Sequence, residues 1–123
     1  MINGFEKHTH DLTEYEFKTL LPVLISGFRS KIGEDRSVTS DHIVNTLKTK
    51  GYKISNVRVR KLINYIRNNN LVPFLVANSK GYYIETDINK MKKYIESLKQ
   101  RANEINRTAN SLEKQLKTAI CQY

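Results

Sequence analysis

The stretch Tyr52-Lys-Ile-Ser-Asn-Val-Arg-Val-Arg-Lys-Leu-Ile-Asn-Tyr-Ile-Arg-Asn-Asn69 decides the fold predicted for this chain. Its apolar residues Val59, Leu62, Ile63 and Ile66 recur at i, i+3, i+4 and i+7. That spacing places them on one face of an α-helix. Ser55 precedes the run and can cap its first turn by accepting a hydrogen bond from a backbone N–H. The stretch therefore predicts a helix with one buried face.

The opposite face of this predicted helix is basic and polar. The whole stretch lacks acidic residues, and its outward positions include Arg60, Lys61 and Asn64. Arg and Lys suit phosphates and the acceptors of guanine, whereas Asn suits the acceptor–donor pair of adenine. The pattern indicates contact with nucleic acid, with a solvated amphipathic helix as the alternative.

The charge balance of the chain also predicts an anionic partner. Its 123 residues carry a net charge of +9, with a pI of about 9.7. The segment from Asp41 to Asn70 contains seven basic residues and one acidic residue, Asp41 itself. The basic residues are Lys48, Lys50, Lys53, Arg58, Arg60, Lys61 and Arg67. Such a one-sided field steers association with polyanions, so we expect nucleic acid first and a membrane surface second.

Cysteine content and hydropathy limit the other classes of function. Cys121 is the only cysteine, which excludes an internal disulfide and a multi-thiolate metal site. The longest apolar run, Leu20 to Ile25, contains Pro22 and is too short to cross a bilayer. No nucleophile–base pair or phosphate loop is visible in the sequence. We therefore expect a non-enzymatic protein of a reducing cytoplasm, without cofactor, metal, small-molecule ligand or membrane association.

The N-terminal part predicts an arm followed by a helix. Residues 1–12 form a polar arm, in which the His8-Thr9-His10-Asp11 cluster is a weak metal signal. Thr13 and Glu16 have the spacing of a capping box, and Leu12 and Phe17 that of a hydrophobic staple. Pro22 should kink or split this helix. Its expected buried face comprises Phe17, Leu20, Leu21, Leu24, Ile25 and Phe28.

The next elements predict a second helix, a tight turn and a hairpin around the basic helix. Val38 is expected in a short strand, and Thr39 or Ser40 caps a helix that ends at Gly51. Tyr52 and Ile54 should pin the turn to the core. After the basic helix, we expect a hairpin with arms 71–77 and 82–85 and the turn Asn78-Ser79-Lys80-Gly81.

Residues 87–123 predict one long helix with a coiled-coil stripe. Apolar residues alternate at spacings of four and three over about four heptads. We expect this stripe to pair two copies of the chain, the alternative being a fold-back onto Phe17, Leu21 and Phe28 of the first helix. The expected dimerisation residues are Met91, Ile95, Leu98, Ala102, Ile105, Ala109, Leu112 and Leu116.

The order helix, short strand, helix, turn, basic helix and hairpin resembles a winged helix-turn-helix domain over residues 12–86. The segments that carry the resemblance are Val38-Thr39-Ser40-Asp41-His42-Ile43-Val44, Ile54-Ser55-Asn56-Val57-Arg58-Val59-Arg60-Lys61-Leu62-Ile63 and Ala77-Asn78-Ser79-Lys80-Gly81-Tyr82-Tyr83-Ile84. With the long C-terminal helix, the chain is similar to small winged-helix proteins of bacteriophages and prophages. The implied fold is mainly α with a small β-hairpin (α+β), divided into an arm (1–12), a winged domain (13–86) and a C-terminal helix (87–123).

The resemblance implies a double-stranded DNA-binding protein of a bacterial host cell, most simply a phage or bacterial transcriptional regulator, and the apolar stripe adds the expectation of a homodimer. Residues 55–69 would enter the major groove, while the wing, 74–85, would touch the backbone. The alternative is a winged-helix component of a phage replication or packaging assembly that acts mainly through protein–protein contacts. The implied DNA-contacting residues are Ser40, Lys53, Asn56, Arg58, Arg60, Lys61, Asn64, Asn78, Ser79 and Lys80.

Overall fold

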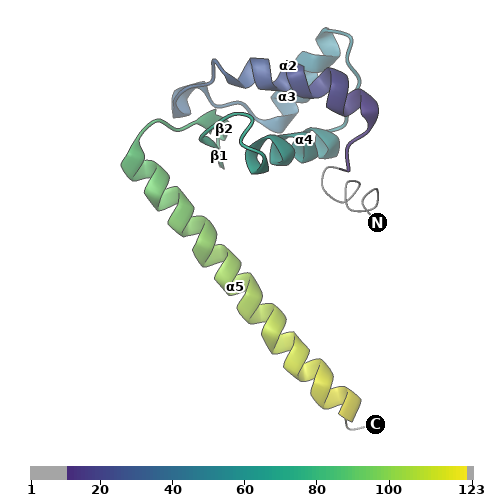
Figure 1. Ribbon diagram of the computed structural model, residues 1–123, viewed down its shortest axis with the longest axis vertical. Helices are drawn as coiled ribbons and strands as arrows, with labels where there is room; N and C mark the ends of the chain where they lie inside the picture. Colours follow the sequence, from purple (N-terminus) through teal and green to yellow (C-terminus); the bar gives the residue numbers. More distant parts are fainter. Residues whose placement is uncertain (1–10, 122–123) are drawn as a thin grey trace. The chain divides into compact units, whose positions relative to one another are not determined.

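The computed structural model describes residues 11–121 and is mainly helical with one β-hairpin, which confirms the α+β class (Figure 1). The division between two compact units falls at Thr86 and Asp87. The expected arm lies outside the described residues, apart from its last two positions. The elements are η1 (Glu16–Leu20), α2 (Leu21–Phe28), η2 (Glu34–Arg36), α3 (Ser40–Thr49), α4 (Asn56–Asn68), β1 (Leu75–Asn78), β2 (Gly81–Ile84) and α5 (Ile88–Cys121).

The first helix contains the irregularity expected from Pro22. Proline has no N–H to donate within a helix. The stretch before it, η1, is a π-helical turn in which the N–H of Leu21 donates to the carbonyl oxygen of Glu16, five residues back. The regular α2 then begins at Leu21, with Pro22 in its first turn, where the missing N–H costs little. Pro22 thus splits the helix through a π turn.

α3 and α4 are joined by a tight turn whose capping matches the sequence prediction. The Thr39 hydroxyl accepts a bond from the N–H of His42 (3.1 Å), and the Ser55 hydroxyl one from Arg58 (3.3 Å). Gly51 takes a φ of +87°, and the next N–H, that of Tyr52, donates to the carbonyl of Leu47 (2.9 Å). This is a Schellman motif, which ends α3 and starts the connection to α4.

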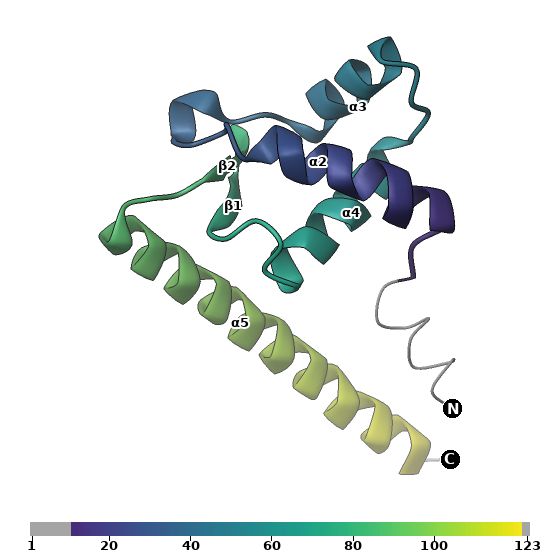
Figure 2. The ribbon, with the colours of Figure 1, turned by 45° about the horizontal axis from the view of Figure 1, so that its top comes forward.

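The buried face of α4 lies at the centre of the core. Val59, Leu62, Ile63 and Ile66 all have a relative exposure of 0%, as their spacing predicted. Tyr52 and Ile54 pack against the same core, which confirms their expected role. Figure 2 shows α2, α3 and α4 around this centre, with the hairpin beside them. The other residues of the buried cluster are Leu12, Leu20, Leu21, Leu24, Phe28, Ile43, Leu47, Val72 and Leu75.

Two residues expected on the buried face of the first helix are not fully buried. Phe17 is 39% exposed, and its ring contacts the edge of Tyr65 at a centroid distance of 6.1 Å. Ile25 is half-buried. The wider π turn shifts the angular positions of residues relative to a regular helix, which explains why the 3.6-residue period fails here.

The hairpin is shorter than expected. Its first strand begins at Leu75, not Leu71, because Pro73 and Phe74, with a φ of +63°, form a turn after α4. Leu75 pairs with Ile84 and Asn78 with Gly81 in an antiparallel register. On the outer edge of β2, Val38 exchanges two backbone hydrogen bonds with Tyr82 (3.0 and 2.8 Å). The short strand expected at Val38 is thus reduced to an isolated antiparallel bridge.

Gly81 lies where this edge comes closest to the hairpin turn. Its φ is +128°, and a Cβ at this position would lie 2.3 Å from the carbonyl oxygen of Val38. Gly51 also has a positive φ, but a Cβ there would have no heavy atom within 4 Å. Only glycine fits position 81 without displacement of the backbone.

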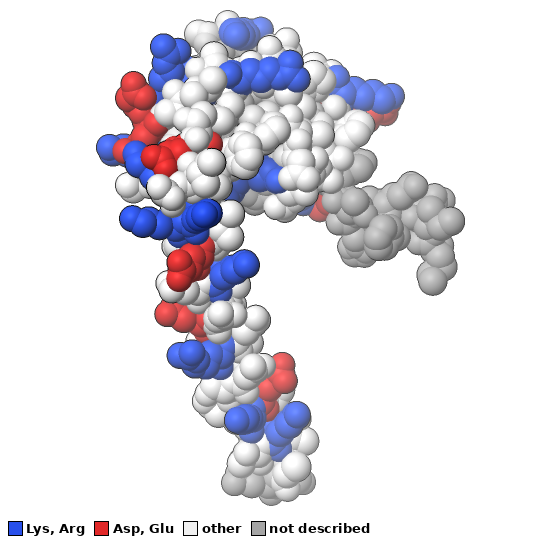
Figure 3. Space-filling view, turned by 60° about the vertical axis from the view of Figure 1, so that its left-hand side comes forward, with Lys and Arg blue, Asp and Glu red and all other residues white. Residues whose placement is uncertain are grey.

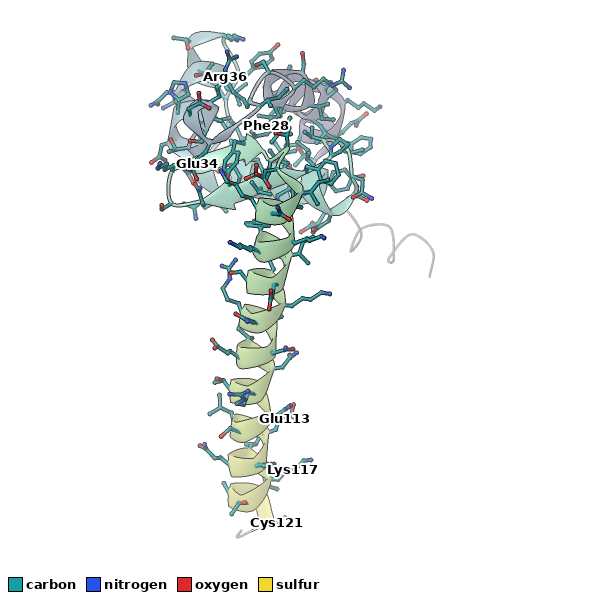
Figure 4. All side chains as sticks on the ribbon, turned by 90° about the vertical axis from the view of Figure 1, so that its left-hand side faces the viewer. Phe28, Glu34, Arg36, Glu113, Lys117 and Cys121 are labelled. Atoms are coloured by element: carbon teal, nitrogen blue, oxygen red, sulfur yellow. The ribbon has the colours of Figure 1, made fainter. Side chains whose placement is uncertain are left out.

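α5 is a single helix with no buried residue along its length. The Asp87 carboxylate caps it by accepting from the N–H groups of Asn89 (2.9 Å) and Lys90 (3.1 Å), so Asp87 is the N-cap. Figure 4 shows side chains projecting on all sides of this helix. The apolar stripe is therefore an uncovered surface within the described chain.

We predict that Gly81→Ala destabilises the first unit more than Gly51→Ala does. Both changes force alanine into a positive φ, which costs about 1–2 kcal/mol. Gly81→Ala adds the clash with Val38 and should bring the loss to about 3 kcal/mol or more. Urea denaturation followed by the near-ultraviolet dichroism of the tyrosines measures both. Equal losses would contradict the close approach at Gly81.

Candidate functional site

The outward face of α4 begins with a network that joins it to α3. The side-chain oxygen of Asn56 accepts hydrogen bonds from Arg60 Nε (2.7 Å) and Ser40 Oγ (3.3 Å). The Asn56 amide donates to the carboxylate of Asp41. Three expected DNA-contacting residues, Ser40, Asn56 and Arg60, are thus brought together. Because Asn56 holds Nε of Arg60, the remaining guanidinium donors have a fixed direction.

One turn further along α4, Asn64 is exposed, as is Arg60 itself. The two residues are four apart, so they lie on the same face of the helix. The opposite face of α4 is fully buried, and this leaves α4 little freedom to rotate about its axis. The pair therefore forms a polar surface of defined position, about one helical turn long.

Arg58 is used inside the protein. Its Nε donates to Oε2 of Glu16 at 2.7 Å, and Nη2 pairs with Oε1 of the same carboxylate. Nη2 also lies 3.3 Å from the backbone carbonyl of Asp11. A bidentate pair with a buried carboxylate is a structural interaction. Arg58, one of the residues expected to contact DNA, thus joins α4 to the start of the first helix.

Glu16 bonds both to Thr13 at the start of the first helix and to Arg58 on α4. Its Oε1 accepts from the N–H of Thr13 (2.9 Å), and its own N–H donates to the Thr13 hydroxyl (3.1 Å), which confirms the predicted capping box. Its side chain is 7% exposed. Hydrogen bonds from Arg58 hold the pKa of Glu16 at about 2, below its ordinary 4.5, although burial acts in the opposite direction. Glu16 is therefore ionised throughout the neutral range.

Other expected contact residues also have partners on the protein. Lys61 pairs with the carboxylate of Asp11. Lys80 Nζ and Asn78 Nδ2 both reach Glu34, at 3.1 and 2.7 Å, so the hairpin turn is tied to η2. Asn78 Oδ1 also accepts from the N–H of Lys80 at 2.8 Å. The tip of the hairpin is thus held by bonds to Glu34 of η2 and by a bond within the turn itself.

Two further expected residues, Lys53 and Ser79, are exposed. Figure 3 shows Lys and Arg side chains spread over the visible face of the first unit, with acidic groups beside some of them. The positive charge on this face is therefore interrupted by carboxylates.

The sequence gives no sign of these carboxylate partners. Glu16 has the spacing of a capping box with Thr13, and no local signal links it to Arg58. The Arg58–Glu16, Lys61–Asp11 and Lys80–Glu34 pairs span 42, 50 and 46 residues along the chain. Only the tertiary fold brings these residues together.

The described residues offer little for other chemistry. Among residues 11–121, no three His, Cys, Asp or Glu side chains gather in a way that could hold a metal ion. The His8 and His10 positions lie outside this range. No helix among these residues has the length and apolar content needed to span a membrane.

Comparison with known proteins does not assign the chain to a family. The chain has no significant match among protein-family models, curated proteins or solved structures.

We predict that the Glu16–Arg58 pair makes stability sensitive to acid. The folded pKa of Glu16 is about 2, below the unfolded value, so its contribution is complete above about pH 4.5 and lost as pH falls toward 2. Glu16→Gln should cost about 3 kcal/mol at pH 7. It should also flatten the loss of stability between these pH values.

Glu14→Gln is the matched control, because Glu14 pairs with Lys18 only on the surface. Denaturation from pH 2 to 7 compares the three proteins. Equal stabilities of the Glu16 and Glu14 variants at pH 7 would show that the buried pair contributes nothing.

Proposed function

We propose that this chain is a double-stranded DNA-binding protein with a winged helix-turn-helix domain, acting as a phage or bacterial regulator. α4 would enter the major groove, and the hairpin would rest on the DNA backbone. The observation that carries the proposal is Arg60, held by Asn56 and followed by exposed Asn64 on a helix with a fully buried back. An oriented guanidinium and an amide are the groups that read guanine and adenine edges.

The order of elements supports the domain assignment. The α3–turn–α4 pair is followed by β1 and β2, and Val38 forms an isolated antiparallel bridge to Tyr82 of β2. The second helix of such a pair reads the major groove in helix-turn-helix proteins, and α4 holds that place in this chain.

The internal ion pairs shape the expected mode of binding. Arg58, Lys61 and Lys80 already have carboxylate partners. Phosphate contacts must then come from exposed cations such as Lys53, or from exchange of the surface pairs of Lys61 and Lys80. The same pairing supports the alternative, a winged-helix component of a phage replication or packaging assembly with weak DNA contact.

Self-association through α5 completes the proposal. Ile105, Leu112 and Leu116 are 69%, 56% and 60% exposed on the stripe. A second copy would cover these residues and bring two DNA-binding domains into one particle.

Selection of bound sites from random DNA tests the proposal. A regulator should enrich a defined sequence with two related half-sites. Uniform weak binding would favour the assembly alternative, and no binding at low salt would overturn DNA binding altogether.

We predict that DNA affinity falls steeply with salt. Each phosphate neutralised contributes a slope of about −0.9 in log K against log salt, so about four phosphates per domain imply a loss of about a hundredfold between roughly 50 and 200 mM salt. Fluorescence anisotropy with labelled duplex measures the slope. A flat titration would contradict binding to a polyanion.

We further predict different defects from α4 and from the hairpin. Arg60→Ala and Asn64→Ala should each cost about 1–3 kcal/mol on the selected site and much less on random DNA. Lys80→Ala should weaken both duplexes equally, because a phosphate contact carries no sequence information.

Arg107→Ala in α5 is the control for loss of one positive charge. Competition binding with cognate and random duplexes compares the variants. Unchanged discrimination in Arg60→Ala and Asn64→Ala would exclude α4 as the reading helix.

A further inference from the structure

The uncovered stripe of α5 contains large and small residues in a fixed order. We call it the seam: Ile88, Met91, Ile95, Leu98, Ala102, Ile105, Ala109, Leu112, Leu116 and Ala119. None of these residues is buried. In heptad notation, residues 88, 95, 102, 109 and 116 occupy a positions, and residues 91, 98, 105, 112 and 119 occupy d positions. The two middle a residues are Ala102 and Ala109. The d residues beside them, Leu98, Ile105 and Leu112, are large.

The first unit does not need the seam to complete its core. Leu21 and Phe28, which were expected to need cover, are 5% and 2% exposed. The buried cluster that contains them draws all its members from residues before Thr86. Of the three first-helix residues expected to need cover, only Phe17, at 39% exposed, still presents surface. A fold-back onto the first helix would therefore gain little, and this favours a second copy as the occupant of the seam.

The alanines distinguish two ways of pairing the helices. In a parallel pair, each layer contains the same residue twice, so Ala102 meets Ala102 and Ala109 meets Ala109 on either side of an Ile105 pair. Close approach at the alanines conflicts with the space that the intervening isoleucines need. Ile at a d position also disfavours parallel dimers. In an antiparallel pair, each a residue faces a d residue.

We propose that two copies pair through antiparallel α5 helices with full overlap of the seam. Ala102 then faces the partner's Ile105, and Ala109 faces the partner's Leu98. Ile95 faces the partner's Leu112, Met91 the partner's Leu116, and Ile88 the partner's Ala119. Every layer contains at least one large residue, and no layer contains two alanines. Antiparallel pairing rests on the self-association proposed above and holds whether or not DNA is the ligand.

Charges beside the seam agree with this register. Lys92 and Glu113 both occupy e positions, and antiparallel helices place e opposite e. The register that aligns the seam brings Lys92 beside the partner's Glu113, twice per dimer. Lys99 then lies beside the partner's Asn106, without a like charge. A shift of one heptad would pair Lys99 with Glu113 and place Ile88 and Met91 beyond the end of the partner's α5 helix.

Cys121 reports the direction of the helices directly. It is the last residue of α5, is exposed, and is the chain's only cysteine (Figure 4). In the antiparallel dimer two labels on Cys121 lie about 35 residues apart along the axis, or about 52 Å at about 1.5 Å per residue. In a parallel dimer they lie side by side, within about 20 Å across two helices.

The experiment is a distance measurement by double electron–electron resonance on full-length protein carrying a nitroxide spin label at Cys121, without DNA. We expect a distance near 50 Å. A distance near 20 Å would overturn antiparallel pairing while retaining the dimer. The control is Asn103→Cys in a Cys121→Ser background, which lies near the midpoint and gives a short distance in either direction. A monomer in sedimentation equilibrium would overturn self-association, and DNA binding is measured separately.

Charge exchange tests the register. Glu113→Lys should weaken the dimer about tenfold, because two attractions become two repulsions. Lys92→Glu/Glu113→Lys should restore the wild-type dissociation constant, and Lys99→Glu/Glu113→Lys should not. In a parallel dimer Lys92 faces the partner's Asp87 and Glu113 the partner's Thr108, so the Lys92 double variant would be the weaker one. That order of affinities would overturn the proposal.

Discussion

The hydrogen-bonded ion pair between the buried carboxylate of Glu16 and Arg58 is the interaction on which the packing of the first unit depends. The carboxylate closes the capping box with Thr13 at the start of the helix, and it receives two bonds from Arg58 on α4. A buried carboxylate needs such partners, because an unpaired charge away from water is strongly destabilising. One residue therefore connects the start of the first helix to α4 and fixes the position of α4 along its own axis.

The orientation of α4 determines which residues face outward. Its back, formed by Val59, Leu62, Ile63 and Ile66, is fully buried, and Arg58 is held at one side. Arg60 and Asn64 consequently remain on the open side. The α3 helix contributes through Ser40 and Asp41, which hold Asn56 and thereby Arg60. The surface proposed to read DNA is thus set by packing beneath it and by polar contacts at its edge.

Much of this fold could be predicted because its signals are local. The helix caps Thr39, Ser55 and Asp87, the positive φ of Gly51 and the buried face of α4 each follow from residues a few positions apart. The candidate site was less predictable, because a basic residue has the same local pattern whether it faces solvent or a distant carboxylate. Arg58, Lys61 and Lys80 looked equivalent to Arg60 in sequence, and only the fold separates them.

The paired backbone of Val38 and Tyr82 has a mechanical consequence. Val38 is bonded in both directions to β2, Gly81 packs against its carbonyl without space for a side chain, and the next residue, Thr39, caps α3. The hairpin cannot shift far without moving the start of α3. α3 in turn holds α4 through Asn56, so hydrogen bonds connect the hairpin to α4 by way of α3. A displacement of the hairpin would therefore be passed to α4 through the start of α3, and a ligand that touched both elements would contact two linked surfaces.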